Sequence, residues 1–118
     1  MYTIKRMKFH RLVHFAKVKP DVENPVFTFL HYTVYPTIVY AQETEPENNE
    51  TVFLAFNKQR TEQVIIYLTQ HRLSKRITIR YWRSNGIDGE IAWLLVQGFT
   101  HSYLRKIPAI RKWLSTPG

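Results

Sequence analysis

The alternation of apolar and polar residues along the chain predicts a protein built mainly from β-strands. Apolar and aromatic residues recur at every second position, or in short runs, within residues 4–18, 26–35, 51–58, 76–83 and 89–99. Successive side chains of a strand point to opposite faces of a sheet, so a period of two is typical of strands with one buried face. The stretch 26–35, VFTFLHYTVY, is almost wholly β-branched or aromatic, which predicts a central strand.

Two segments depart from this alternation and predict helices. In residues 61–73 the apolar positions recur at helical spacing, and Thr61 is placed to cap the N-terminal end. The C-terminal tail, residues 102–115, carries an apolar stripe at the same spacing, with Ser102 placed as its cap. We therefore expect one helix inside the chain and one at its end.

Polar stretches separate these elements. The acidic segment QETEPENNE, residues 42–50, predicts a loop, either a solvated tip or an anionic flap that competes with a polyanion for a basic surface. The segment SNGIDG, residues 84–89, predicts the connection of a hairpin between two strands.

The resulting order of elements predicts one domain over residues 1–118, of a mainly β (α+β) class. Three strands, a helix, two strands and a terminal helix is the order of a small five-stranded antiparallel OB-like barrel, with a helix between strands 3 and 4 and a C-terminal helix. An open antiparallel sheet covered by one or two helices fits the same order and remains the alternative.

The amino-acid composition indicates the cellular compartment that we expect for this domain. The chain has no cysteine, which excludes disulfides and thiolate metal sites and fits a reducing compartment. Its apolar runs are far shorter than a membrane span, and its first residues lack the pattern of a secretory signal. We expect a cytoplasmic protein with no transmembrane segment.

The distribution of charge is the strongest indication of a partner. The net charge is +8, yet residues 1–19 carry only bases, residues 20–57 only acids, and residues 58–118 eleven bases against three acids. A basic excess concentrated in two blocks predicts a polyanionic partner, and nucleic acid is the one that we expect.

The strand 76–83 has two faces of different chemistry. Its odd-numbered apolar residues belong to the core, whereas Arg76, Arg80 and Trp82 share the opposite face. Guanidinium groups bind phosphates, and an indole ring offers a surface on which an unpaired base can stack. This face, flanked by Lys75 and Arg83, is the predicted centre of a nucleic-acid site.

Two further groups of cations complete the prediction. On the N-terminal strand Arg6, Lys8 and His10 share a face, and adjacency of this strand to residues 76–83 would merge the two surfaces. The tail supplies a secondary basic group, namely Arg105, Lys106, Arg111 and Lys112.

No motif in the sequence predicts a metal, a cofactor or a small-molecule substrate. His10 and His14 have HxxxH spacing, but on a strand they would lie about 13 Å apart, too far to share a metal ion. Glycine-rich phosphate loops and nucleophile motifs do not occur. A metal-independent ribonuclease that uses histidines such as His31 leaves no linear motif and stays a minor alternative to a non-catalytic protein.

We therefore expect a non-catalytic nucleic-acid-binding module that acts through basic charge and aromatic stacking. Single-stranded DNA or RNA is favoured, because aromatics on strands suit unstacked bases, and a role as an accessory factor in replication, DNA transfer or RNA handling would follow. The alternative is a protein-interaction or assembly module, such as a homo-oligomer, in which the basic charge is incidental.

Overall fold

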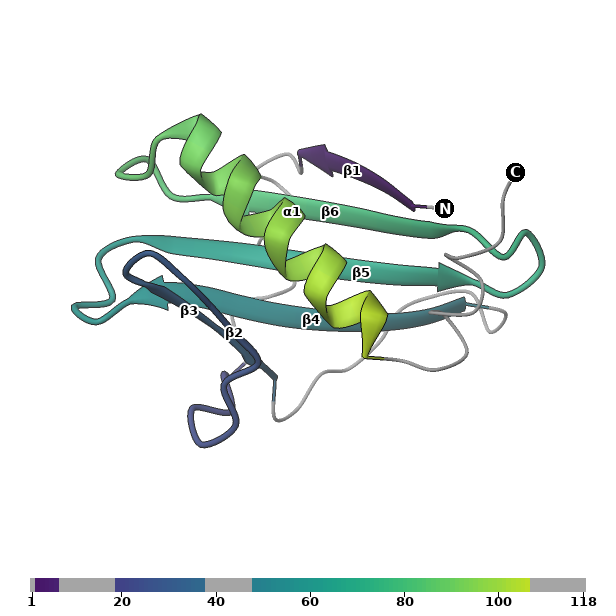
Figure 1. Ribbon diagram of the computed structural model, residues 1–118, viewed down its shortest axis with the longest axis horizontal. Helices are drawn as coiled ribbons and strands as arrows, with labels where there is room; N and C mark the ends of the chain where they lie inside the picture. The colour runs from purple at the N-terminus through teal and green to yellow at the C-terminus, as the bar shows by residue number, and fades with distance from the viewer. Residues whose placement is uncertain (1, 7–18, 38–47, 107–118) are drawn as a thin grey trace.

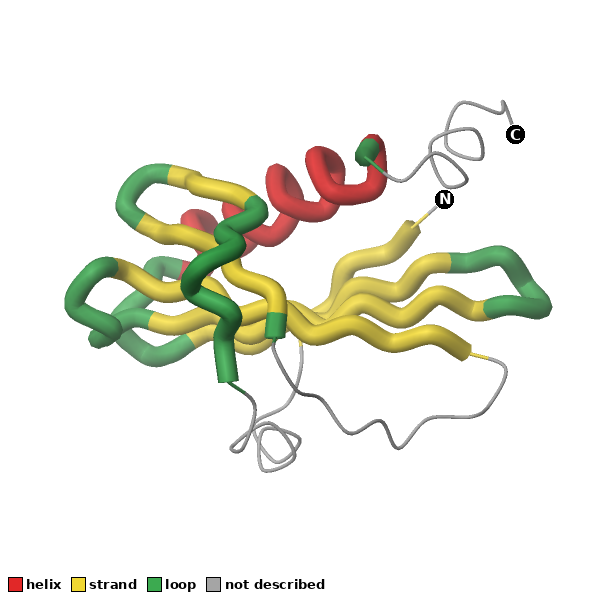
Figure 2. The backbone as a smooth tube through the Cα atoms, turned by 90° about the horizontal axis from the view of Figure 1, so that it is seen from below, coloured by secondary structure: helices red, strands yellow, loops and turns green. Residues whose placement is uncertain are grey.

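The computed structural model describes residues 2–6, 19–37 and 48–106, and within them one curled sheet carries a helix on one face (Figure 1; Figure 2). The strands are β1 (Tyr2–Arg6), β2 (Phe27–Phe29), β3 (Tyr32–Pro36), β4 (Asn48–Asn57), β5 (Gln63–His71) and β6 (Ile77–Arg83), and the helix is α1 (Gly89–Arg105). Their order across the sheet is β1-β6-β5-β4-β3-β2.

The sheet is mixed because its N-terminal strand joins it out of chain order. Strands β2 to β6 pair with their chain neighbours in antiparallel fashion, whereas β1 pairs with β6 in parallel, with Tyr2 beside Ile77. The longest strands, β4 and β5, lie in the middle, and the short β2–β3 hairpin curls up beside α1 at the far edge (Figure 2).

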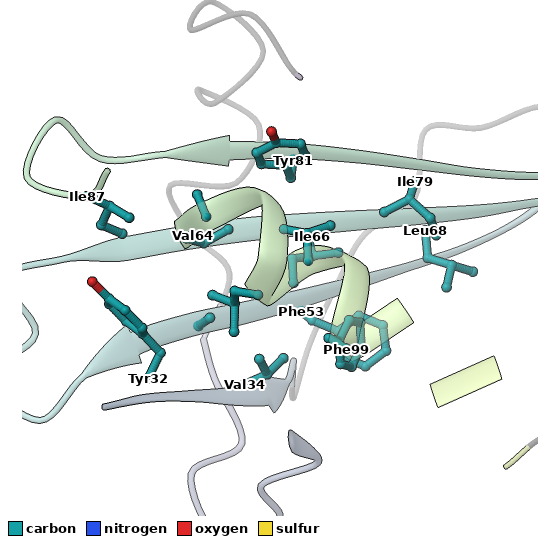
Figure 3. Close-up of a cluster of buried hydrophobic side chains, with 14 of the residues drawn as sticks. Tyr32, Val34, Phe53, Val64, Ile66, Leu68, Ile79, Tyr81, Ile87 and Phe99 are labelled. Carbon is teal, nitrogen blue, oxygen red and sulfur yellow. The ribbon is translucent and has the colours of Figure 1, made fainter. Parts of the chain in front are cut away.

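The main core lies between the sheet and α1 (Figure 3). Alternate residues of the central strands, such as Phe53, Ile66 and Ile79, point toward the helix and are fully buried. Phe99 fills the centre of the helix face and contacts the rings of Phe53 and Phe27, with centroids 4.7 and 6.1 Å away. These contacts hold α1 across the strands.

A second apolar cluster occupies the opposite face of the sheet. Val52 and Leu54 of β4 and Ile65 and Tyr67 of β5 are buried there, with Trp82 packed against them. Because the centres of β4 and β5 are buried on both faces, residues 52–56 and 64–68 are apolar without a break.

The prediction of a helix over residues 61–73 is wrong, because residues 63–71 form β5. Val64, Ile65 and Ile66 are β-branched and prefer a strand, and burial on both faces explains a continuous apolar run that lacks strict alternation. Thr61 caps no helix; it lies in the turn that joins β4 to β5.

The prediction of a strand over residues 89–99 is also wrong, because this segment begins α1. Asp88 caps the helix: its carboxylate accepts hydrogen bonds from the backbone N–H groups of Glu90 and Ile91. The segment SNGIDG therefore joins a strand to a helix instead of closing a hairpin. Ser102 lies inside the helix, so it is not the cap of a new one, and the part of the predicted tail after Lys106 lies outside the described residues.

The stretch 26–35 is two strands rather than one central strand. A tight turn at Leu30, whose φ of 53° is left-handed, separates β2 from β3, and the pair lies at the edge of the sheet. Its apolar residues do not indicate a central strand, because the half-buried Phe27 and Phe29 pack against the main core from the edge strand β2, beside α1.

The mainly β class with a C-terminal helix is confirmed. The strands expected at 51–58 and 76–83 correspond to β4 and β6. The helix expected between strands 3 and 4 is β5 instead, and among the described strands β1 and β2 form the two ends of the sheet rather than closing a barrel. The rest of the strand expected at 4–18 and most of the acidic loop lie outside the described residues.

Candidate nucleic-acid interface

Strand β6 presents the two faces that its alternation predicts. Ile77, Ile79 and Tyr81 are buried in the main core, and Arg80 and Trp82 lie on the face away from α1. Arg76, at the start of the strand, is exposed.

Arg80 contacts other side chains of the sheet and is only partly available to a ligand. Its guanidinium carbon lies 4.3 Å from the centre of the Tyr67 ring, and Nη2 lies 3.8 Å from Oε1 of Glu50 and 3.5 Å from Oγ1 of Thr69. The side chain of Glu50 is almost fully buried, so this cation neutralises a carboxylate inside the sheet. Glu50, which was assigned to the acidic loop, is part of β4.

Trp82 is half-buried against the second apolar cluster, on the opposite side of the sheet from α1. The helix therefore does not cover it. The part of the indole that remains exposed is the surface on which a base would have to stack.

Arg83 holds the connection between β6 and α1. Its Nη1 donates a 2.6 Å hydrogen bond to the carbonyl oxygen of Ile87, and its guanidinium lies beside Gly89, at the first turn of the helix. The half-buried Arg83 thus fixes the start of the helix.

The N-terminal strand β1 lies beside β6, as a merged basic surface requires. The cation that β1 places on the same face as Arg80 is Lys5, however, and not Arg6. Lys5 pairs with Arg80 in the register and is exposed, whereas Arg6 pairs with Tyr81 and so belongs to the side of the sheet that carries α1. Of the other N-terminal cations, Lys8 and His10 lie outside the described residues.

The tail cations are only partly described. Arg105 and Lys106 are exposed at the C-terminal end of α1, where positive charge complements the helix dipole. Arg111 and Lys112 lie outside the described residues.

Among the residues that the structure describes, the turn between β5 and β6 holds the densest exposed cluster of cations. Residues 72–76, RLSKR, which we call the basic tip, are all exposed, and three of the five are Arg72, Lys75 and Arg76. The tip projects from one end of the sheet (Figure 1). Neither of the two ion pairs found among residues 2–6, 19–37 and 48–106 involves it.

Sequence reasoning missed Arg72 and Leu73 as members of this surface. The helix expected over residues 61–73 placed both at its last turn. The signal that identifies them is the pair of strand-like runs, QVIIYLTQH and ITIRYWR, which enclose a short polar stretch.

A cluster of polar side chains ties the opposite end of the sheet together. Oε1 of Glu62 accepts a 3.1 Å hydrogen bond from the hydroxyl of Tyr32, Oε2 accepts one of 3.2 Å from Asn57, and Nε2 of His31 lies 3.4 Å from Oε2. The His31 ring lies on that of Tyr32, with centroids 4.2 Å apart. These contacts join the β2–β3 turn to the β4–β5 turn.

Burial, together with the hydrogen bond to Glu62 and its negative charge, raises the pKa of Tyr32 above 10. The folded protein therefore holds this proton more tightly than the unfolded chain. The contribution of the protonated Tyr32 to the free energy of unfolding is complete below pH 10 and is lost as the pH rises through the higher, native pKa.

We expect the free energy of unfolding to fall in this alkaline range, and to fall less steeply in Tyr32→Phe. Urea titrations across the range, with absorbance of the ionised phenol at each pH, measure this difference. Tyr2→Phe, at a half-buried tyrosine, is the control, and equal slopes in the two variants would contradict the assignment.

In the part of the chain that the structure describes, no three His, Cys, Asp or Glu residues gather as metal ligands do. None of the helical residues described forms a segment long and apolar enough to cross a membrane.

Comparison of the chain with protein-family models, with curated proteins and with solved structures found no match. A function must therefore be inferred from the exposure, charge and contacts of the described residues.

Proposed function

We propose that this chain is a non-catalytic nucleic-acid-binding module that favours single-stranded DNA or RNA. The observation that carries the proposal is the basic tip, where Arg72, Lys75 and Arg76 are exposed together without an acidic partner among the described residues. Such a cluster lowers its own electrostatic repulsion by binding a polyanion, and binding to phosphates releases counterions from the nucleic acid.

The tip continues into a basic strip along the sheet. Arg80 and Trp82 are two residues apart on the face of β6 away from α1, Arg76 immediately precedes the strand at the same parity, and Lys5 lies beside Arg80 on β1. A strand carries such side chains at regular intervals of about 7 Å, which suits an extended backbone with unstacked bases better than a rigid duplex. Such a strip forms on an open sheet as well as on a closed OB-like barrel. A role as an accessory factor in replication, DNA transfer or RNA handling follows as the wider proposal.

Arg80 and Trp82 are poor first targets for mutation because both have structural contacts in the sheet. The exposed tip gives a cleaner test. In the triple variant Arg72→Gln, Lys75→Gln, Arg76→Gln we expect the affinity for a single-stranded oligonucleotide to fall by about tenfold or more at low salt. The slope of log K against log salt should become shallower by about 2, because three phosphate contacts are lost. Fluorescence anisotropy over a salt series measures both quantities.

A matched control removes the same charge elsewhere. Lys19→Gln, Lys58→Gln, Arg60→Gln changes three exposed cations outside both the tip and the predicted site, and should bind with nearly the affinity of the unmodified protein. Equal losses in the two triple variants would mean that net charge alone attracts the nucleic acid. If the unmodified protein binds no oligonucleotide at low salt, the proposal is wrong.

One feature supports the alternative of a protein-interaction module. Trp93 and Leu94 are adjacent on the outer face of α1, and 39% and 43% of their surfaces are exposed. Exposed aromatic and aliphatic groups at one place are typical of protein interfaces. A complex that persists in light scattering after nuclease treatment would favour this alternative.

A further inference from the structure

The basic tip is an ordered turn with an apolar residue at its apex. The backbone N–H of Lys75 donates to the carbonyl oxygen of His71 at 2.9 Å, and the N–H of His71 donates to that of Arg76 at 2.8 Å. Lys75 adopts a left-handed φ of 60°, and Nε2 of His71 lies 3.0 Å from Oγ1 of Thr78 at the base of the turn. The tip is thus held in one shape before any partner binds.

Leu73 is the most exposed large apolar side chain of the described residues, at 87%. Cations stand on both sides of it, Arg72 toward β5 and Lys75 with Arg76 toward β6. An aliphatic side chain in this place contributes nothing to the core, and its burial against another molecule would be favourable. The partner must therefore offer an apolar slot between two lines of negative charge.

We propose that the basic tip enters the minor groove of a duplex segment and inserts Leu73 between two adjacent base pairs. The groove has a phosphate backbone on each side, which matches the cations on the two sides of Leu73, and stacked bases at its floor, which match the leucine. Side chains such as leucine act as wedges in this way, and a two-stranded ribbon is one of the elements that place them.

This inference rests on the proposed function and extends it. The strip along β6 would hold a single strand. The tip cations, which contact the phosphates of a lone single strand, would at a junction grip the duplex from which that strand leaves. The bound form is then a junction between single- and double-stranded nucleic acid.

An anionic membrane surface is the competing partner for a basic turn with an apolar apex, and the structure favours nucleic acid over it. A single leucine brings only its four side-chain carbon atoms into lipid, and stable attachment needs more buried apolar surface than one side chain provides. A wedge between two base pairs needs only one apolar side chain.

Fluorescence of 2-aminopurine in a DNA duplex, placed beside a flexible T–A step, tests the insertion because unstacking of the base raises its emission. The unmodified protein should raise the emission. Leu73→Ser should abolish this rise and weaken duplex binding roughly tenfold, while the salt slope stays unchanged because the cations remain. Leu73→Met, which keeps an apolar wedge, should retain the rise.

Leu30→Ser is the matched control, since Leu30 is 63% exposed at the apex of another turn, between Phe29 and His31 rather than among cations. It should behave like the unmodified protein. Duplex binding without a change in emission, or a Leu73→Ser variant that behaves as the unmodified protein does, would overturn the insertion and leave the proposed function standing. Binding to phosphatidylserine vesicles that depends on Leu73, with no response of the duplex, would overturn it in favour of a membrane. Absence of binding to every oligonucleotide would overturn both proposals.

Discussion

Replacement of Phe99 by alanine is expected to lower the free energy of unfolding by about 3–5 kcal/mol, the range for loss of a buried phenylalanine. Phe99 has no exposed surface and contacts three other rings. Those of Phe53 and Tyr103 lie 4.7 and 5.5 Å away, and that of Phe27 lies 6.1 Å away on the edge hairpin. The substitution would leave a cavity where α1, the centre of the sheet and β2 meet.

Urea denaturation followed by circular dichroism measures this loss. Trp93→Ala is the control, because Trp93 lies on the same helix and is also aromatic but is 39% exposed. Its replacement should cost much less. Because alanine favours a helix more than either aromatic residue, helix propensity cannot cause a loss, and equal losses in the two variants would contradict the role of Phe99 packing against the sheet. Nucleic-acid binding by any folded Phe99→Ala protein should be unchanged, since Phe99 lies on the side of the sheet away from Arg80 and Trp82.

Replacement of Asn57 by alanine is expected to cost roughly 2 kcal/mol, because one buried side chain organises the whole β4–β5 turn. Its Oδ1 accepts hydrogen bonds from the backbone N–H groups of Thr61 and Glu62, at 2.9 and 3.0 Å. Its amide nitrogen donates to Oγ1 of Thr61 and Oε2 of Glu62, at 2.8 and 3.2 Å. Arg60, in the same turn, adopts a left-handed φ of 58° that the surrounding contacts must hold in place.

Thr61→Ala provides the comparison, because it removes a single acceptor from this network and leaves both backbone contacts to Asn57. We expect it to cost about 1 kcal/mol or less. Unfolding by urea at neutral pH measures both variants. If Asn57→Ala proves no more harmful than Thr61→Ala, water has replaced the lost acceptor and the turn does not depend on Asn57.

The parts of the fold that the sequence predicts are those in which local pattern and tertiary environment agree. In β6 the alternation of Ile77, Ile79 and Tyr81 with polar residues matches burial on one face, so both the strand and its core face follow from the sequence. Segment 63–71 has the same strand structure but is buried on both faces, which removes the alternation. The chain neighbours of a residue do not reveal that a second apolar cluster will cover its far face.

The start of α1 at residue 89, well before the helix expected over residues 102–115, was not predicted for a related reason. Its first residues, Ile91 to Val96, form an apolar run that reads as a strand when taken alone. The evidence for a helix lies in the spacing of Ala92, Leu95, Val96 and Phe99, and in the cap at Asp88. The Asn-Gly pair before it suggested a hairpin, yet Asp88 three residues later is the signal that determines the structure.

The sequence predicts which types of side chain form the candidate site, but not where these side chains lie relative to one another. The alternation of β6 identifies the face that carries Arg80, but the buried Glu50 beside it belongs to a stretch whose composition suggests a loop. The basic tip required knowledge of where β5 ends. Once that strand is recognised, the exposure of Leu73 among cations follows from the length of the turn.

The parallel pairing of β1 with β6 has a consequence for the order in which the chain folds. Strands β4, β5 and β6 are joined by short turns and can associate as each leaves the ribosome, because closing a short loop costs little entropy. Tyr2 must wait for Ile77, so β1, which is synthesised before β4, β5 and β6, is the last of these four strands able to find its place. Until β1 pairs with it, β6 is an unprotected edge on the nascent protein.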